Sequence, residues 1–235
     1  MFRFHAQTAG SSLIAQQPDT NIVRVALQAL AAVLGGTQSL HTNSRDEALA
    51  LPTEDSALLA LRTQQIIAFE SGVANTVDPV AGSYTIEKLT NQLQQAAEEY
   101  LNKIDEMGGM LRAIDRGFVQ REIQQAAYEY QSAIENGSQV IVGVNRYQEE
   151  AGREIPILKI DPEIEHGQVK RLQKLRARRD RNRVEAALRE IEATAKSERN
   201  LMPAILQAVI AFATVGEISE ILGRVFGQYK EAVVI

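Results

Sequence analysis

The chain has 235 residues, 45% hydrophobic and 23% charged, with a net charge of −5. This composition is typical of a packed globular protein, and the negative balance gives no general attraction to nucleic acid. There is no cysteine and there are only three histidines, which excludes disulfides and thiolate metal sites and predicts no bound metal held by this chain's own side chains. No window approaches the roughly 20 apolar residues that cross a bilayer, so a cytoplasmic protein without membrane or nucleic-acid partners is expected.

The chain begins with a pattern of period two, which predicts a strand. Phe2, Phe4 and Ala6 fall on one face, and Arg3, His5 and Gln7 fall on the other. A turn of small residues follows at 8–12, where a bulky ligand could approach the backbone. The pattern leaves two interpretations open for both His5 and Gln7, namely polar residues of an ordinary strand or contacts to a ligand.

A second short extended segment is predicted at 37–43, after a helix from Asn21 to Leu34 that Gly35 and Gly36 end. A strand between two helices in an α/β unit normally consists of Val, Ile and Leu, because both its faces are buried. Here the segment is mostly polar, and a buried polar group without a partner costs about 1–3 kcal/mol. We therefore expect a bound ligand at this place, although His41 taken alone is better explained as a hydrogen-bonded structural histidine.

Two consecutive strand–helix units predict parallel strands with polar residues at their ends. Such ends carry the active sites of (β/α) barrels. Two strands cannot close a barrel, so the pattern indicates the later part of a larger domain. The stretch from Ser44 to Glu47 reads as a capping box that opens a short helix. On local grounds alone, Glu47 then bonds the backbone N–H of Ser44 and needs no ligand.

The remainder of the chain reads as mainly helical. Helices are predicted from Thr53 to Phe69, from Ile86 to Met107, after Gly109, from Val119 to Ile134, from Asp161–Pro162 onward, and as two or three segments between Val184 and Tyr229. The apolar run 139–145 predicts one further strand. Between 170 and 183 there are eight Lys or Arg, best explained as a solvated helix face, with a subunit contact as the alternative. A nucleic-acid patch is disfavoured because aromatic residues are not interleaved.

Several motifs, in order along nearly the whole chain, closely resemble the large subunit of adenosylcobalamin-dependent methylmalonyl-CoA mutase. They are Phe4-His5-Ala6-Gln7-Thr8-Ala9-Gly10, Asn21-Ile22-Val23-Arg24, Gly35-Gly36-Thr37-Gln38-Ser39-Leu40-His41-Thr42-Asn43-Ser44, Asp46-Glu47-Ala48-Leu49, Asp78-Pro79-Val80-Ala81-Gly82-Ser83-Tyr84, Met107-Gly108-Gly109-Met110, Val142-Gly143-Val144-Asn145-Arg146-Tyr147 and Thr214-Val215-Gly216-Glu217. The resemblance implies an α/β fold: the C-terminal part of a (β/α)8 TIM barrel at 1–147, followed by a mainly helical region at 148–235.

The resemblance also implies an activity, radical isomerisation of methylmalonyl-CoA and succinyl-CoA with adenosylcobalamin as cofactor. In that family, coenzyme A threads along the barrel axis and the cobalamin lies across the carboxyl ends of the strands. Carried over by position, the substrate-binding residues are His5, Gln7, Gln38 and Ser39, and the cofactor-binding residues are Gly10, Asn43, Glu47 and Ala50. This reverses the local interpretation of Glu47, which would hold the ribose hydroxyls. Ser11 stands where single-chain mutases often have tryptophan, so the corrin contacts should differ there.

The family's principal catalytic residues would lie upstream of Met1, and the Asp-x-His-x-x-Gly motif that supplies the lower axial histidine does not occur in this sequence. The resemblance therefore implies a fragment, truncated at its amino end, that needs the other barrel strands and a small cobalamin-binding subunit in a hetero-oligomer. By itself the fragment should be inactive. An isobutyryl-CoA-type mutase subunit and a noncatalytic helical assembly module derived from the mutase are the alternatives.

Overall fold

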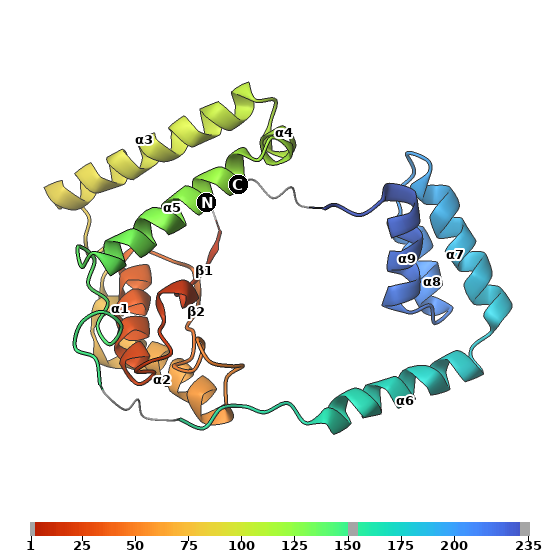
Figure 1. The fold of residues 1–235 in the computed structure, drawn as a ribbon, viewed down its shortest axis with the longest axis horizontal. Helices are drawn as coiled ribbons and strands as arrows, with labels where there is room; N and C mark the ends of the chain where they lie inside the picture. Colours follow the sequence, from red (N-terminus) through yellow and green to blue (C-terminus); the bar gives the residue numbers. More distant parts are fainter. Residues whose placement is uncertain (1–2, 150–154, 231–235) are drawn as a thin grey trace. The chain divides into compact units, whose positions relative to one another are not determined.

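The computed structural model of the chain describes residues 3–149 and 155–230. The chain divides into two compact units, and the described residues up to Leu158 belong to the first and those from Lys159 to the second. Figure 1 shows the order of the elements along the chain. The predicted end of the mutase barrel at residue 147 stays a prediction, because a division into compact units does not test it.

A small parallel sheet opens the first unit. Strand β1 (His5–Gln7) pairs with β2 (Ser39–His41) in the register His5 with Ser39 and Gln7 with His41. Helix α1 (Thr20–Leu34) connects the two strands, and its residues 21, 25 and 29 form one buried stripe with a spacing of four. Both predicted strands and their parallel direction are confirmed. The structure shows a mainly helical α/β fold with these two strands among its described residues, and it does not show a closed barrel.

Helix α2 (Glu54–Glu70) follows the sheet, as predicted. The Thr53 side chain caps the helix by accepting a hydrogen bond from Ser56 N–H, and Gly72 continues the chain in the left-handed region with φ +74°. The short helix predicted at Ser44 is wrong, because residues 45–49 form consecutive turns. A 3-10 turn at Val73–Asn75 and the connector after it lead to the next helices.

Helices α3 (Tyr84–Glu106), α4 (Met110–Asp115) and α5 (Phe118–Glu135) complete the helical part of the first unit. Neither α3 nor α5 has a buried residue. They meet at Tyr100, whose hydroxyl donates to Glu122 Oε2 at 2.6 Å and whose ring centre lies 6.5 Å from that of Phe118. The apolar residues of these two amphipathic helices therefore stay largely exposed.

The strand predicted at 139–145 is also wrong, because this segment is a compact turn. The Asn145 side chain accepts from Ile141 N–H at 2.7 Å and donates to the carbonyls of Ile134 and Gln139 at 2.8 and 2.7 Å. Gly143 has φ +84°, which suits a turn better than a strand. One asparagine thus satisfies backbone groups that a neighbouring strand would otherwise pair.

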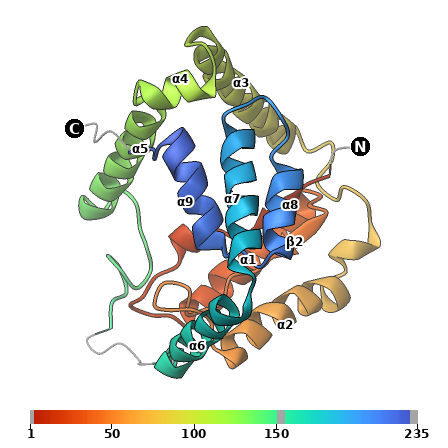
Figure 2. The same cartoon turned by 90° about the vertical axis from the view of Figure 1, so that its right-hand side faces the viewer.

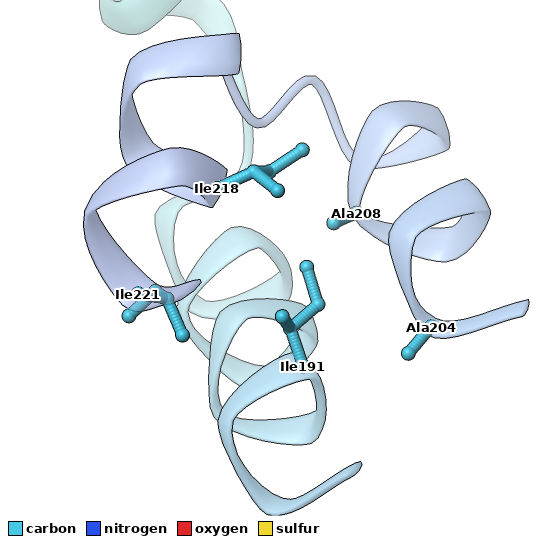
Figure 3. Packing of buried hydrophobic residues seen from close by; sticks show 5 residues of the cluster. All are labelled: Ile191, Ala204, Ala208, Ile218 and Ile221. Atoms are coloured by element: carbon cyan, nitrogen blue, oxygen red, sulfur yellow. The ribbon is translucent and has the colours of Figure 1, made fainter. Parts of the chain in front are cut away.

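The second unit begins with α6 (Pro162–Arg178), which Asp161 caps through Glu163 N–H and which has no buried residue. Helices α7 (Arg181–Ala195), α8 (Met202–Ile210) and α9 (Val215–Phe226) lie side by side in both views (Figures 1 and 2). Their apolar side chains converge on one cluster, formed by Ile191, Ala204, Ala208, Ile218 and Ile221 (Figure 3).

The predicted helices of this region are confirmed, and the capping motif Thr214–Glu217 has the reciprocal hydrogen bonds of a capping box. Within the described residues, no helix is long and apolar enough to span a membrane. In the same part of the chain, no group of three or more His, Asp or Glu side chains is arranged to hold a metal ion.

Candidate functional site at the strand ends

One face of the two strands carries the polar side chains predicted to bind substrate. His5, Gln7, Ser39 and His41 are exposed, whereas Ala6 and Leu40 between them are half-buried on the opposite face. His5 Nδ1 and Ser39 Oγ are 2.8 Å apart, within hydrogen-bond distance. The parallel register thus brings together two of the predicted substrate residues, which are 34 positions apart in the sequence.

Gln7 and Asn43 join the predicted substrate residues to the predicted cofactor residues. Gln7 Nε2 donates to Asn43 Oδ1 at 2.9 Å, just beyond the carboxyl ends of the strands. The backbone there is held by Thr8, whose N–H donates to His41 O at 3.1 Å and whose hydroxyl accepts from Asn43 N–H at 2.9 Å. Since Thr8 and Asn43 are both buried, this corner of the site has a fixed geometry.

Three of the predicted cofactor residues meet at one point. A Cβ placed on Gly10 would lie 2.6 Å from Asn43 Nδ2 and 3.5 Å from Glu47 Oε1. Contacts within this chain therefore explain why position 10 is glycine, since any larger residue would collide with the Asn43 amide. Asn43 is 2% exposed, yet its Nδ2 has no hydrogen-bond partner. A buried donor without a partner is costly, so this point is suited to a ligand oxygen.

The turn that carries Glu47 is organised by a buried carboxylate. Asp46 is fully buried and accepts from Thr53 N–H at 3.1 Å, while its carbonyl accepts from the N–H groups of Leu49 and Ala50. Burial raises the pKa of the Asp46 carboxyl, but hydrogen bonds from neighbouring hydroxyls and from Thr53 N–H outweigh it and leave the pKa below its usual value. The carboxylate therefore stays ionised and keeps the turn closed.

Glu47 does not make the predicted capping bond to Ser44 N–H. Instead, Glu47 N–H donates to Ser44 O at 3.2 Å in a turn, and the exposed Glu47 carboxylate has no hydrogen bond within the described part of the chain. The physical reason is that residues 45–49 form turns and not a helix, so the Glu47 side chain is not carried back over Ser44 N–H. Ala50, predicted to pack against the cofactor, is half-buried at the far end of the same turn.

Two pockets flank β2. One, of about 220 Å³, is lined by the predicted substrate residues Gln38 and Ser39 together with apolar residues of α1 and α2. The other, of about 210 Å³, includes His41, Ser44 and Glu47. Gln38 and Ser39 thus lie toward the amino end of β2, and the predicted cofactor residues lie beyond its carboxyl end. The two groups occupy opposite ends of the same short strand.

Two residues that position the site were not predicted as site residues from the sequence. Asn21 is fully buried on the α1 stripe, accepts from Ile14 N–H at 3.1 Å and donates to the carbonyls of Ile14 and Arg45 at 2.9 and 3.0 Å. Gln64 of α2 donates to Thr42 Oγ1 at 2.9 Å and so fixes the end of β2. Asn21 had a signal in the sequence, because it is a polar residue in register with the buried Val25 and Ala29.

The chemistry that these side chains offer is hydrogen bonding from neutral amides, hydroxyls and imidazole, with one carboxylate at Glu47. Such a set binds and orients a ligand rich in oxygen atoms. Ser39 and His5 pair a hydroxyl with an imidazole, but within the described residues the His5 ring has no second hydrogen bond to orient it, and so the set suits positioning more than proton transfer.

The family model for methylmalonyl-CoA mutase matches residues 1–228. The chain is 47% identical to methylmalonyl-CoA mutase of Rhizobium meliloti (strain 1021) over 231 residues. This alignment covers 97% of the chain and 32% of the relative. It is 46% identical to the 2-hydroxyisobutanoyl-CoA mutase large subunit of Aquincola tertiaricarbonis, over 97% and 41% of the two chains. The chain is 45% identical to the mitochondrial methylmalonyl-CoA mutase of Homo sapiens, over 98% of the chain and 31% of the relative.

These relatives are therefore longer proteins, of which the chain spans between 31% and 41%. The match nonetheless runs through both compact units and includes both ends of the site at β2. By sequence, the chain belongs to the methylmalonyl-CoA mutase family.

Proposed function

We propose that this chain contributes substrate- and cofactor-binding residues to an adenosylcobalamin-dependent isomerase that interconverts methylmalonyl-CoA and succinyl-CoA. The observation that carries the proposal is the junction of Gln7, Asn43, Gly10 and Glu47 at the strand ends, where a buried amide donor lacks a partner. Homologues at 45–47% identity are named as mutases. Because the chain spans about a third of their length, we expect it to be inactive by itself.

The substrate residues in this proposal are His5, Gln7, Gln38 and Ser39. They lie on the exposed face of the sheet or in the pocket beside β2. His5 and Ser39 already lie within hydrogen-bond distance of each other, so they can present a matched donor and acceptor to the polar acyl thioester. In a barrel completed by the remainder of the protein, this face would line the axis along which coenzyme A extends.

The cofactor residues are Gly10, Asn43, Glu47 and Ala50, and the geometry fits an adenosyl group. Asn43 Nδ2 offers a donor and Glu47 an acceptor around one point, which matches the mixed character of ribose hydroxyls. When bound, adenosylcobalamin would supply the radical chemistry. The residues of this chain would orient the ribose and exclude water from it.

The proposed assembly is a hetero-oligomer with a small cobalamin-binding subunit. One relative is named a large subunit, which implies a smaller partner for that protein, and we extend this arrangement to the present chain.

The same relative motivates a second candidate function, because it is a 2-hydroxyisobutanoyl-CoA mutase at nearly the same identity as the methylmalonyl-CoA mutases. A branched acyl-CoA without a free carboxylate, as in the isobutyryl type, is the corresponding substrate class.

The test is conversion of methylmalonyl-CoA, isobutyryl-CoA and 2-hydroxyisobutanoyl-CoA by the complete large subunit combined with a cobalamin-binding subunit. We expect turnover of methylmalonyl-CoA. Turnover of only isobutyryl-CoA or 2-hydroxyisobutanoyl-CoA would replace the proposed methylmalonyl-CoA mutase function by the second candidate function. If the complex binds neither acyl-CoA nor adenosylcobalamin, the chain is a noncatalytic assembly module. Glu47→Gln serves as the site variant, and we expect it to weaken adenosylcobalamin binding while the complex still assembles.

A further inference from the structure

Gln7 has a role that its place on the substrate face does not suggest. Its side-chain amide donates to Asn43 Oδ1 at 2.9 Å. A carboxamide has a carbonyl oxygen on one side and an NH₂ group on the other, and the two are not interchangeable. Once Oδ1 is held by Gln7, the NH₂ group of Asn43 must point the other way, toward Gly10 and Glu47.

The surroundings of Asn43 leave it little freedom. The residue is 2% exposed and its backbone N–H is held by the Thr8 hydroxyl at 2.9 Å. The side chain can therefore change what it presents mainly by exchanging the places of Oδ1 and Nδ2. In the structure the NH₂ group of Gln7, and not its carbonyl oxygen, faces Asn43, and because an NH₂ group can only donate, this rotamer of Gln7 matches one of the two orientations.

The selected orientation leaves Nδ2 buried and without a partner, 2.6 Å from the position that a Gly10 Cβ would take. The exposed Glu47 lies beside the same position, and its carboxylate has no hydrogen bond in the described structure, so it can turn aside and admit a ligand oxygen. A donor and an acceptor are then both available to the ligand. In the opposite orientation of the amide, two acceptors, Asn43 Oδ1 and the Glu47 carboxylate, would face each other.

We infer that Gln7 is a positioning residue for the cofactor pocket: it orients the Asn43 amide so that Nδ2, and not Oδ1, faces the ligand beside Gly10 and Glu47. This inference rests on the proposed function. It moves the main effect of Gln7 from the acyl-CoA to the adenosyl group. It also makes Gln7, one of the predicted substrate residues, a direct contact to the predicted cofactor residue Asn43.

The test is the affinity of the complete enzyme for adenosylcobalamin and for hydroxocobalamin, which lacks the adenosyl group, followed by absorbance in wild type, Gln7→Glu and Gln7→Met. The carboxylate introduced by Gln7→Glu accepts hydrogen bonds only, so it reverses the Asn43 amide. We expect Gln7→Glu to bind adenosylcobalamin about tenfold or more weakly and hydroxocobalamin as wild type does. Gln7→Met leaves the Asn43 amide free to take either orientation without adding charge, so it should lose less affinity for adenosylcobalamin than Gln7→Glu.

The matched control is Gln38→Glu, the same chemical change at the opposite end of the site, for which we expect both cobalamin affinities to be retained. The inference is overturned if Gln7→Glu binds both cobalamins like wild type, if it weakens both equally, or if only the KM for acyl-CoA rises. Failure of the proposed function has a different signature, since the wild-type enzyme would then bind no cobalamin, and that result would overturn both.

Discussion

The two compact units bury different kinds of side chain. In the second unit, the fully buried large side chain is Ile191, which packs against alanines and isoleucines of α8 and α9. In the first unit, the largest fully buried side chains are Asn21, Asp46 and Ser56, all of them polar and hydrogen-bonded. One unit is held mainly by apolar packing and the other has a polar framework around its site.

The difference has a consequence for function. Apolar packing is non-directional and tolerates small shifts, whereas hydrogen bonds fix both distance and angle. A site that must orient a ligand benefits from hydrogen bonds, because they fix its geometry. The turns at 8–12 and 42–50 are held in this way, by specific donors and acceptors rather than by volume alone. Variants in each unit test this contrast, and we expect the largest effect at Asn21.

Asn21→Leu should destabilise the first unit most. It leaves Ile14 N–H and two carbonyls without their partner, which costs about 4 kcal/mol at about 1–3 kcal/mol for each unsatisfied group. Hydrogen exchange should accelerate at residues 13–14 and around Arg45, while α7–α9 stay protected. The control is Asn91→Leu on the exposed surface of α3, expected to change stability by less than about 0.5 kcal/mol. Equal effects of the two variants would refute the polar framework.

Ile191→Ala should be the most damaging apolar truncation in the second unit. Removing a fully buried isoleucine from the cluster of α7–α9 costs about 2–5 kcal/mol, because a cavity remains. Urea unfolding followed by hydrogen exchange of α7 amides measures this loss. Ile164→Ala on α6, where the side chain is 64% exposed, should cost less than about 0.5 kcal/mol. A small loss at Ile191 would mean that the cluster is not the stabilising core.

Glu217→Gln should destabilise the second unit in a pH-dependent way. Arg179 donates to both Glu217 oxygens, at 2.7 and 2.5 Å, and this bond, together with those from Thr214, lowers the pKa of Glu217 to about 2. At pH 7 we expect a loss of about 2 kcal/mol.

The sign of this pH dependence follows from the lowered pKa. Glu217 stabilises the fold fully above its usual pKa of 4.5, and the contribution disappears as the pH falls from 4.5 toward 2. The difference in unfolding free energy between wild type and Glu217→Gln should therefore narrow over that range. A difference that is constant from pH 7 to pH 3 would contradict the ion pair.

Thr42→Val should have the smallest effect, about 1 kcal/mol. The Thr42 hydroxyl donates to Ala60 O and accepts from Gln64 Nε2, both at 2.9 Å, and so ties the end of β2 to α2. Thr63→Val is the matched control, because the Thr63 hydroxyl only bonds Leu59 O within its own helix, an interaction of little net value. Thermal unfolding of the two variants compares them directly, and the larger shift should belong to Thr42→Val.

Much of the fold was predictable from local patterns. The period-two start at His5–Gln7, the helix pattern of α1 and the helix starts at Thr53 and Asp161 each predicted an element that the structure contains. Two predictions failed where a side chain took the place of a backbone partner. Asn145 turned an apolar run into a loop, and Asp46 turned an expected helix into consecutive turns.

The residues of the candidate site were predicted from their resemblance to a family, and their arrangement was not. Patterns along the chain report neighbours a few residues apart, so they determined helices, strands, caps and the parallel direction of β1 and β2. The contacts between His5 and Ser39 and between Gln7 and Asn43 join positions 34 and 36 residues apart. Such contacts depend on how strands and turns pack together. Only the tertiary structure could therefore decide that the Asn43 amide faces Gly10, and that Gln7 holds it there.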